Sequence, residues 1–402
     1  MLPVADAQAQ LLARIAAQAP LAAEDIALTD AAGRVLAEDL IARISQPPAD
    51  VSAMDGWALH GSDIATLPAR LKPIAAVAAG HPVETEITPG TCARIFTGAP
   101  LPPGADTVVL QEDCTVGPDG LVEVRDATAG RHVRKFGLDF KTDGTVLSAG
   151  KRLSARDVGL AAAAGHPWLR VTRRPRVALL ATGDEVVRPG DPLSPGQIVS
   201  ANSYMLAALV RSVGGDPIIL GIARDEDADV RRLAAAAKGC DILVTTGGAS
   251  VGDHDRVQAA LGEIGLNLDF WKIAMRPGKP LMIGGLGDLT LIGLPGNPVS
   301  AYVCGLLFLV PALKALQGDP APLPVLSQAE LAVDLKANDL RQDYVRSCLT
   351  LRDGSLPLVE PARPQDSSMM SILADSDALL VRPPHDPARQ AGDKVMILSA
   401  LA

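Results

Sequence analysis

Three glycine-rich turns in the middle of the chain carry the residue types that could bind an anion. They span residues 246–253, 275–280 and 294–300, and each follows a short apolar run. Glycine turns at strand ends bring bare backbone N–H groups close to a ligand, which is how α/β proteins hold phosphates and other oxyanions. The pattern therefore predicts an anionic substrate.

A basic cluster accompanies the second turn. The chain has ten lysines, and Lys272 and Lys279 flank Arg276 within eight residues. One interpretation is a solvated basic edge, which is the ordinary role of such a cluster. The alternative is an oxyanion site, because Pro277 and Gly278 fix a turn that holds Lys279 beside free backbone N–H groups. We favour the oxyanion site for Lys279.

Carboxylates follow two of the predicted strands. Asp253 ends the first glycine turn and Asp255 begins the next expected helix, where both could ligate Mg²⁺ while the ion neutralises bound phosphates. Asp is also a favoured helix N-cap, which is the simpler interpretation for Asp255. Asp184 and Glu185 lie in another turn, 181–186, which would emerge at the same carboxyl edge of the sheet. Either they are solvated, or they contact a metal or the substrate.

The first and third turns supply further candidate binding residues. The third opens a long apolar helix, whose start offers unpaired N–H groups and the Ser300 hydroxyl to an anion. Alternatively, Asn297 and Pro298 only cap and shape this turn. The candidate substrate-binding residues in the two turns are Gly247, Gly248, Ser250, Gly252, Asp253, Pro295, Gly296, Asn297 and Ser300.

Two rigid loops in the first third of the chain also contain polar groups. Residues 52–59 place Asp55 before a glycine and a tryptophan, and residues 97–106 begin with Thr97 and contain three prolines. By composition alone, both loops are structural turns.

The predicted elements around these turns indicate a multidomain α/β protein. Helical periodicity marks 5–17 and 154–164, with Ser154 placed to cap the second helix, and short extended segments fill the stretch between them. From residue 173 onward, apolar strands alternate with helices in the βαβ pattern of a mostly parallel sheet. The expected strands are 177–182, 217–222, 242–246 and 289–293, and the expected helices are 203–212, 227–237, 255–261 and 299–316.

A proline-rich stretch at 318–324 ends this pattern, and the rest of the chain alternates without a helical period. Strands are expected there at 331–335, 344–351, 378–382 and 394–398. The predicted domains are a split helical domain (1–45 plus 138–172), an inserted β-rich domain (46–137), a three-layer α/β domain (173–318) and a C-terminal small β domain (319–402).

Composition excludes several classes of partner. The net charge of −9 argues against nucleic acid or an acidic membrane surface, and the aromatic content of 3% argues against base-stacking platforms. The five cysteines are scattered, without C-x-x-C spacing, which is typical of reduced core residues. The N-terminus does not resemble a signal peptide, and the longest apolar run, 299–313, is shorter than a membrane span. We expect a cytoplasmic protein.

In order and spacing, six segments together resemble the molybdopterin molybdenumtransferase family, known as MoeA in bacteria and as the E domain of gephyrin in animals. The segments are 52–58, 97–106, 181–186, 246–255, 271–280 and 293–300. The resemblance covers nearly the whole chain. It implies the four-domain architecture above, an elongated homodimer, and an active site between the α/β domain of one subunit and parts of its partner. It also implies that molybdate is inserted into adenylylated molybdopterin, with Mg²⁺ assisting hydrolysis of the adenylate.

The resemblance assigns roles to individual residues. Glu185, Asp225 and Asp255 match the family's acidic residues, which we interpret as metal ligands. Lys272, Arg276 and Lys279 match its basic cluster, although the position of Arg276 is lysine in some relatives. The remaining matches are Asp55, Thr97 and Asp139 among the catalytic residues, and Arg346 and Ser367 among the substrate-binding residues of the C-terminal domain.

The resulting hypothesis is that Lys279, Arg276 and Ser300 hold molybdate near the dithiolene, while the acidic residues fix Mg²⁺ against the phosphoanhydride. One alternative is a related enzyme that adenylylates molybdopterin and would consume ATP. The other is a non-catalytic dimeric scaffold that binds a partner peptide, as gephyrin does. The intact set of basic and acidic residues argues against a pure scaffold, which needs no anion site.

Overall fold

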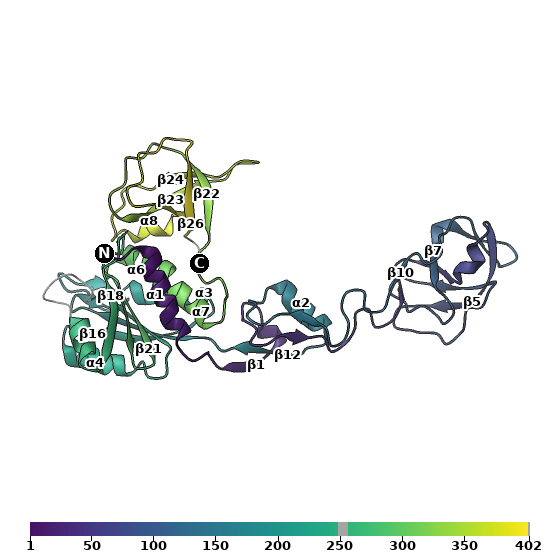
Figure 1. Cartoon of the computed structure of the whole chain (residues 1–402), viewed down its shortest axis with the longest axis horizontal. Helices are drawn as coiled ribbons and strands as arrows, with labels where there is room; N and C mark the ends of the chain where they lie inside the picture. The colour runs from purple at the N-terminus through teal and green to yellow at the C-terminus, as the bar shows by residue number, and fades with distance from the viewer. Residues whose placement is uncertain (248–255, 401–402) are drawn as a thin grey trace. The chain divides into compact units, whose positions relative to one another are not determined.

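The structure is a computed structural model that describes residues 1–247 and 256–400. The chain forms two compact units (Figure 1). The larger unit contains Met1–Glu24, Gly33–Val35 and Val171–Ala402, and the smaller unit contains Asp25–Ala32 and Leu36–Arg170. The chain passes between the units within strands β1 (Ala23–Ala27) and β12 (Trp168–Thr172), and on either side of the short segment Gly33–Val35.

A six-stranded sheet forms the centre of the larger unit. Its strands, in spatial order, are β16 (Asp216–Ala223), β13 (Arg176–Thr182), β17 (Ile242–Thr246), β21 (Leu289–Leu294), β20 (Met282–Leu286) and β18 (Leu266–Trp271). The first four are parallel and correspond to the four strands expected from the sequence. Two further strands were not predicted from the sequence: β20 pairs antiparallel with β21, and β18 pairs antiparallel with β20.

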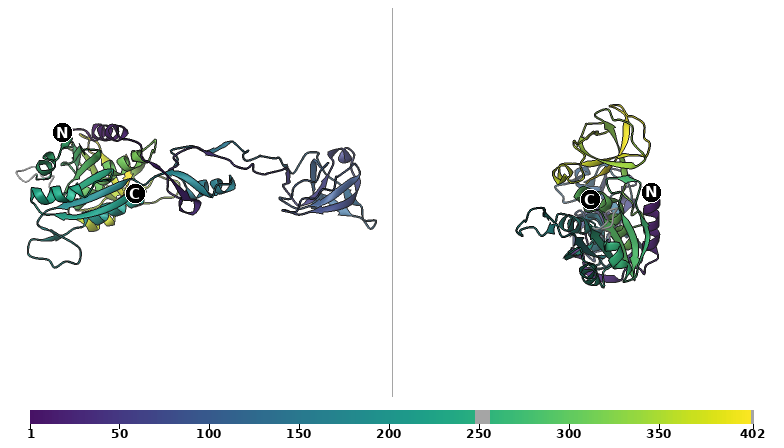
Figure 2. Two further views of the ribbon diagram at one scale, coloured as in Figure 1. Left: turned by 90° about the horizontal axis from the view of Figure 1, so that it is seen from below. Right: turned by 90° about the vertical axis from the view of Figure 1, so that its left-hand side faces the viewer.

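Helices cover both faces of this sheet, which makes three layers (Figure 2). Alternate residues of the strands separate into two cores: Leu179 and Val244 face one side, whereas Leu180 and Leu243 face the other. The first side is covered by α1 (Val4–Ala16), α3 (Asn202–Ser212), α6 (Pro298–Cys304) and α7 (Val310–Leu316), and the second by α4 (Asp227–Ala235) and α5 (Arg256–Gly262). The predicted α/β class is therefore confirmed.

Helix α1 belongs by packing to this core. Its Val4, Ala7, Leu11 and Ile15 are buried against the strands and against α7. The spacing of these residues gives the helix one apolar stripe, which requires a core to cover it. The split helical domain expected from the sequence (1–45 plus 138–172) includes this helix, and the domain boundaries stay a prediction.

A long apolar helical stretch, Pro298–Leu316, runs through the middle of the first core. It is the one stretch in the described parts of the chain with the length and composition of a membrane span, and 83% of it is buried inside the protein. One turn of π-helix, η4 (Gly305–Leu309), separates α6 from α7. Pro311 explains this turn, because proline lacks an N–H and its ring clashes with the carbonyl four residues earlier.

A second six-stranded sheet forms the C-terminal part of the larger unit. Its strands are β19 (Met275–Arg276), β23 (Gln342–Thr350), β24 (Leu358–Pro361), β22 (Leu326–Leu331), β26 (Lys394–Ser399) and β25 (Ala378–Arg382), with helix α8 (Met370–Ala374) between β24 and β25. The expected strand at 331–335 is wrong, because β22 ends where it was expected to begin. Strand β19 comes from the second glycine turn, so that Arg276 pairs with Asp343 in the register of β23.

A third six-stranded sheet fills most of the smaller unit. Its order is β7 (Thr107–Leu110), β4 (Gly56–Leu59), β6 (Thr91–Ile95), β5 (Ala69–Val77), β9 (Val122–Val124) and β8 (Cys114–Val116). The same unit also contains helix α2 (Ala155–Ala163) and the short strands β2 (Leu40–Ile41), β3 (Val51–Ser52), β10 (Val133–Arg134) and β11 (Thr145–Leu147). The predicted β-rich module is therefore present.

The start of α2 allows a test of stability. Ser154 and Asp157 form a reciprocal capping box, as the sequence suggested for Ser154, and Lys151 lies 2.6 Å from the Asp157 carboxylate. The bonds from Lys151 and Ser154 lower the pKa of Asp157 to about 2. A lowered pKa contributes stability that is present above the ordinary value of 3.8 and is lost as the pH falls through about 2.

We therefore expect Asp157→Asn to destabilise α2 by about 1–2 kcal/mol at pH 7. Hydrogen exchange of the α2 amides in the variant and the wild-type protein measures this difference. The difference should shrink as the pH is lowered toward 3, because the Asp157 carboxyl of the unfolded chain, with its ordinary pKa of 3.8, takes up a proton before that of the folded chain. A difference that stays constant over this range would contradict the assignment.

Candidate active site at the carboxyl edge of the sheet

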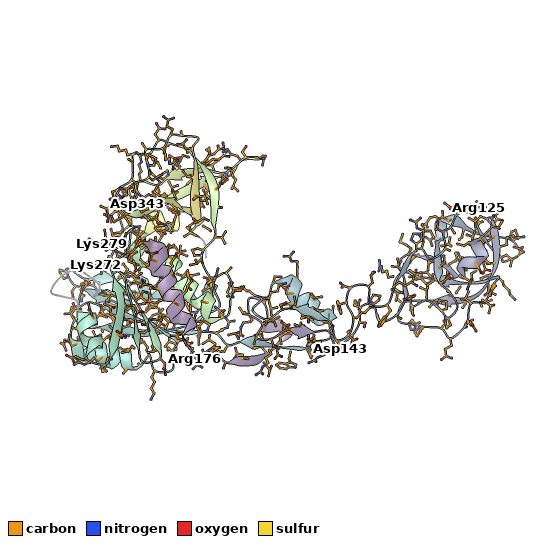
Figure 3. All side chains as sticks on the ribbon, in the orientation of Figure 1. Arg125, Asp143, Arg176, Lys272, Lys279 and Asp343 are labelled. Atoms are coloured by element: carbon orange, nitrogen blue, oxygen red, sulfur yellow. The ribbon has the colours of Figure 1, made fainter. Side chains whose placement is uncertain are left out.

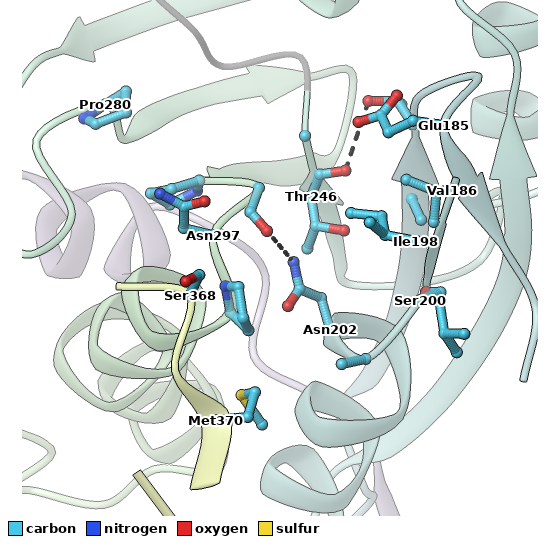
Figure 4. Close-up of a pocket in the computed structure, with 18 residues that line it drawn as sticks. Glu185, Val186, Ile198, Ser200, Asn202, Thr246, Pro280, Asn297, Ser368 and Met370 are labelled. Atoms are coloured by element: carbon cyan, nitrogen blue, oxygen red, sulfur yellow. Dashed lines mark hydrogen bonds between the residues drawn. The ribbon is translucent and has the colours of Figure 1, made fainter. Parts of the chain in front are cut away.

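A cleft of about 640 Å³ opens at the carboxyl ends of β13, β17 and β21 (Figure 4). This is the edge at which open α/β sheets bind ligands. We call it the first cleft. It is lined by the strand ends (Ala181, Thr182, Thr246, Gly247, Pro295, Gly296, Asn297 and Pro298), by Glu185, Val186, Ile198, Val199, Ser200, Ala201 and Asn202, and by Pro280, Ser368 and Met370.

Close backbone contact at Gly247 brings the strand ends together. Its φ is +88°, and a Cβ added there would lie 2.6 Å from the carbonyl oxygen of Thr182. Any other residue would therefore push β13 and β17 apart. A Cβ added at Gly296 would lie 3.6 Å from the Cα of Gly247, so the first and third glycine turns also touch.

Two residues that the sequence analysis missed complete this edge. Asn202 donates from its side-chain amide to the carbonyl of Gly296 at 2.7 Å, and the Thr182 hydroxyl reaches the carbonyl of Thr246 at 3.5 Å (Figure 4). Asn202 stands at the first position of α3, and a polar residue before a predicted helix is the signal that could have found it. Ile198 and Val199 also line the cleft and give it an exposed apolar surface.

A second cleft, of about 610 Å³, lies beside the first and shares Pro280 with it. It is lined by the second glycine turn (Met275 to Pro280), by Ser300, by Arg341 and Asp343 to Val345, and by Gln365, Asp366 and Ser367. The turn is held in place at Gly278, whose φ is +108° and whose added Cβ would meet the Cys304 sulfur at 2.4 Å. The second cleft therefore places the predicted residues Arg276, Lys279, Ser300 and Ser367 around one space.

Lys279 and Arg276 differ in their surroundings. The exposed Lys279 side chain has no hydrogen bond or ion pair with residues 1–247 or 256–400, and Figure 3 shows it on the turn near Asp343. The Arg276 guanidinium instead pairs with Asp343 and, at 3.2 Å, with Asp339. These carboxylates, Asp343 first, raise the pKa of Arg276. An oxyanion that enters the cleft meets an ammonium group without a partner in the described parts of the chain, and a guanidinium that already has partners.

The two clefts are joined by one pair of contacts across the C-terminal sheet and the α/β core. Asn297 donates from its side-chain amide to the Ser367 hydroxyl at 2.9 Å, and the backbone N–H of Val299 donates to the Ser367 carbonyl at 3.2 Å. Asn297 occupies the N-cap position of α6 and Pro298 its first turn, but the Asn297 side chain forms no cap hydrogen bond and binds Ser367 instead. A carbonyl from a distant loop takes one of the free N–H groups at the helix start instead.

Arg346 lies beneath this junction and is 1% exposed. Its guanidinium donates to the carbonyls of Met369 (3.0 Å), Asp366 (2.8 Å) and Pro364 (3.4 Å), and its backbone N–H donates to Gln365 (3.1 Å). Burial lowers the pKa of Arg346. The geometry therefore assigns it a positioning role for residues 364–369, in place of the direct substrate contact that the resemblance implied.

We expect Arg346→Met to destabilise the 364–369 loop by about 3 kcal/mol, because three partly buried carbonyls lose the buried guanidinium that donates to them. Hydrogen exchange of this loop and of Val299 is the measurement. Arg346→Lys should recover only part of the loss, since one ammonium group cannot reach all three carbonyls. Arg363→Met, a change at the exposed arginine that directly precedes this loop, is the control. Equal protection in the Arg346 and Arg363 variants would contradict the positioning role.

The structure leaves other predicted residues outside these clefts. Lys272 lines neither cleft; it has a φ of +81°, and its carbonyl accepts from the Leu2 N–H at 3.2 Å. Asp225 lies near the same edge as Glu185, and its N–H donates to Asp184 at 3.1 Å. Gly248, Ser250, Gly252, Asp253 and Asp255 lie outside the described residues. Among the described residues, no group of three or more His, Cys, Asp or Glu side chains could hold a metal ion.

Asp55, Thr97 and Asp139 belong to the smaller unit. The Asp55 carboxylate accepts from both the N–H and the hydroxyl of Thr97, each at 2.7 Å. These bonds lower the pKa of Asp55, with a smaller contribution from the charge of Arg94. Asp139 is exposed, and its backbone N–H donates to the carbonyl of Gln46 at 2.9 Å. The smaller unit thus presents Asp55 and Thr97 as one hydrogen-bonded pair at the surface.

Comparison with known proteins places this arrangement in a family. Three family models match the chain: the MoeA N-terminal region (domain I and II) over residues 2–165, a probable molybdopterin binding domain over 178–315, and the MoeA C-terminal region (domain IV) over 328–399. A structure titled as the molybdopterin biosynthesis MoeA protein of Pyrococcus horikoshii OT3 superimposes with a TM-score of 0.85 at 28% identity, covering 99% of this chain and 100% of the other.

Named relatives agree with the family models. A molybdopterin molybdenumtransferase of Nostoc sp. is 35% identical over 388 residues, which cover 93% of this chain and 88% of the relative. One from Bacillus subtilis is 33% identical over 384 residues, covering 93% and 89%. The chain is thus a multidomain α/β protein whose α/β domain matches the model of a probable molybdopterin binding domain. It belongs to the MoeA family, as the resemblance predicted.

Proposed function

We propose that this chain is a molybdopterin molybdenumtransferase, which inserts molybdate into adenylylated molybdopterin and releases AMP. One observation carries the proposal: two clefts with different chemistry adjoin at the carboxyl edge of the sheet and are joined through Asn297 and Ser367. A transfer reaction between a nucleotide-linked pterin and an oxyanion needs two such sites in contact. The names of the relatives support the same activity.

The first cleft suits the adenylylated pterin. Its floor consists of the turns at Gly247 and Gly296 together with the start of α6, where backbone N–H groups favour phosphate. Ile198 and Val199 give it an apolar wall for a flat ring. The residues Gly248, Ser250, Gly252 and Asp253 of the first glycine turn would add to the same site, as predicted from the sequence.

The second cleft suits molybdate. Lys279 offers an ammonium group without a partner among the described residues, and the Ser300 and Ser367 hydroxyls line the same space. Such donors neutralise an oxyanion and fix its position beside the pterin. Arg276 would add a guanidinium once it is released from its carboxylates.

The proposed metal ligands are Glu185, Asp225 and Asp255. Carboxylate oxygens are the ligands that Mg²⁺ prefers, and Glu185 lines the first cleft, where the phosphoanhydride would lie. A bound Mg²⁺ would neutralise charge on the phosphates as AMP leaves. The chain's own part is to orient the anhydride and admit water to it. Asp225 lies near this edge through its contact with Asp184.

The homodimer and the cytoplasmic location predicted from the sequence also stay predictions. In the dimer that the resemblance implies, parts of the partner subunit complete the active site. The exposed Asp55 and Thr97 pair is suited to such a contribution, since its carboxylate is held in the ionised form. Asp139 and Lys272 are proposed to act in the same reaction on the strength of the resemblance alone.

One assay tests the proposal. The purified full chain is incubated with adenylylated molybdopterin, Mg²⁺ and molybdate, and AMP release is followed with and without molybdate. Release that depends on molybdate is expected. ATP consumption with pyrophosphate release would favour the adenylylating enzyme, and binding of the pterin without any turnover would favour a scaffold.

A further inference from the structure

The second cleft contains an acid that the proposed reaction does not use. Asp343, on β23, lines the cleft and is only 7% exposed. One of its carboxylate oxygens, Oδ2, pairs with Arg276. The other, Oδ1, is buried without a hydrogen-bond partner among the described residues. An unpaired carboxylate oxygen inside a protein is costly, so its presence beside an anion site calls for a reason.

The charges around Asp343 come from several elements. Arg276 lies on the neighbouring strand β19, and Arg382 on β25 is already engaged by Asp386. The groups that face Asp343 or share its cleft are Arg276, Asp339, Arg341, Lys279, Asp366 and Arg382. Burial raises the pKa of Asp343, and this effect exceeds the opposing effect of Arg276.

The two partners of this ion pair are unequal in exposure. The Arg276 side chain is 47% exposed, whereas that of Asp343 is 10% exposed. Water and Asp339 can therefore solvate Arg276 if Asp343 loses its charge, but Asp343 has little to replace Arg276. A dianion entering the cleft competes with Asp343 for the same guanidinium and is repelled by its negative charge.

We propose that Asp343 is a specificity-determining residue of the second cleft: an internal carboxylate that occupies Arg276 until an oxyanion dianion replaces it. The dianion then binds most tightly when Asp343 is neutral, and its binding draws a proton onto the Asp343 carboxyl. The inference rests on the proposed function only for the identity of the dianion as molybdate. Its alternative is an ion pair that does no more than tie β19 to β23.

The test is isothermal titration calorimetry of the full chain with molybdate, repeated with sulfate, at several pH values. For the wild-type protein, binding should tighten as the pH falls and should be accompanied by net proton uptake, measured in buffers of different ionisation enthalpy. Asp343→Asn should bind about tenfold more tightly than the wild type at the highest pH and should lose this proton uptake. Dividing the affinity of Asp343→Asn by that of the wild type at the same pH cancels the effect that protonation of the ligand itself has on both affinities.

Asp339→Asn is the matched control. It removes a second carboxylate from Arg276, but one that is 40% exposed, so its affinity should stay within about threefold of the wild type with the pH dependence kept. Equal affinity of the wild type and Asp343→Asn at all pH values would overturn the inference, and so would dianion binding by the wild type without proton uptake. The second result is obtained even if Asp343→Asn does not fold.

These outcomes are separate from those of the proposed function. Dianion binding with the expected proton uptake, but without molybdate-dependent AMP release, would keep the role of Asp343 and remove the transferase. Molybdate-dependent AMP release, with equal dianion binding by the wild type and Asp343→Asn, would keep the transferase and remove the role of Asp343.

Discussion

Replacing Lys279 by glutamine is expected to lower molybdate-dependent AMP release by about 100-fold, the scale of losing one preorganised charge from an oxyanion site. Its ammonium group lines the second cleft without a partner among the described residues, whereas Arg276 is shared with two carboxylates. The loss should be greatest at low molybdate concentration. The measurement is the initial rate of AMP release as a function of molybdate concentration.

The control for this change is Lys394→Gln, which removes the same charge from an exposed position on β26. Because both lysines are exposed, neither substitution should change the thermal unfolding temperature by more than about 2 °C. If Lys279→Gln and Lys394→Gln released AMP at the same rate, Lys279 would not contribute to oxyanion binding and the solvated basic edge would be the better interpretation.

Gly247→Ala is expected to have the largest effect on the first cleft. The added Cβ would lie 2.6 Å from the Thr182 carbonyl, at a φ of +88° that L residues rarely adopt. Strands β13 and β17 must then separate at their carboxyl ends, at a local cost of about 2–4 kcal/mol. We expect binding of the adenylylated pterin to fall at least tenfold, since a small displacement at such a site has that effect.

Gly239→Ala separates the clash from the backbone strain. Gly239 has a φ of +85° in the same domain, but nothing lies within 4 Å of its added Cβ. Gly239→Ala should lower the free energy of unfolding by about 1 kcal/mol and leave pterin binding unchanged. Fluorescence titration with the pterin and chemical unfolding of both variants make the comparison. Similar pterin affinities for the two variants would show that the approach of Gly247 to Thr182 is not what shapes the cleft.

Regular elements with a clear period could be predicted from the sequence. The four parallel strands are continuous apolar runs, and the helices between them carry one apolar stripe each, so their positions agree with the structure. Strand β20 has two glycines, Gly284 and Gly285, that interrupt such a run. Strand β22 was misplaced because the apolar residues after Leu331 look more like a strand than the polar ones before it.

The candidate site shows a different limit. The turns at Gly247, Lys279 and Gly296 could be found because glycine, proline and charge are local signals. The partners of Arg276 lie more than sixty residues away in the sequence, at Asp339 and Asp343, and no local pattern indicates them. The burial of Arg346 is equally hidden, because an arginine in an alternating strand looks the same whether it faces water or a ring of carbonyls.

The hydrogen bonds from Asn297 and Val299 to Ser367 also limit how the C-terminal domain can be exchanged between related chains. A gene fusion that exchanged residues 319–402 for those of a relative would carry over its own version of the 364–369 loop. Unless that loop presented a hydroxyl and a carbonyl at the same place, the recipient's α6 would lose the acceptor at its first turn. The C-terminal sheet is therefore not a freely interchangeable module, and the two segments are expected to accept mutations as a pair.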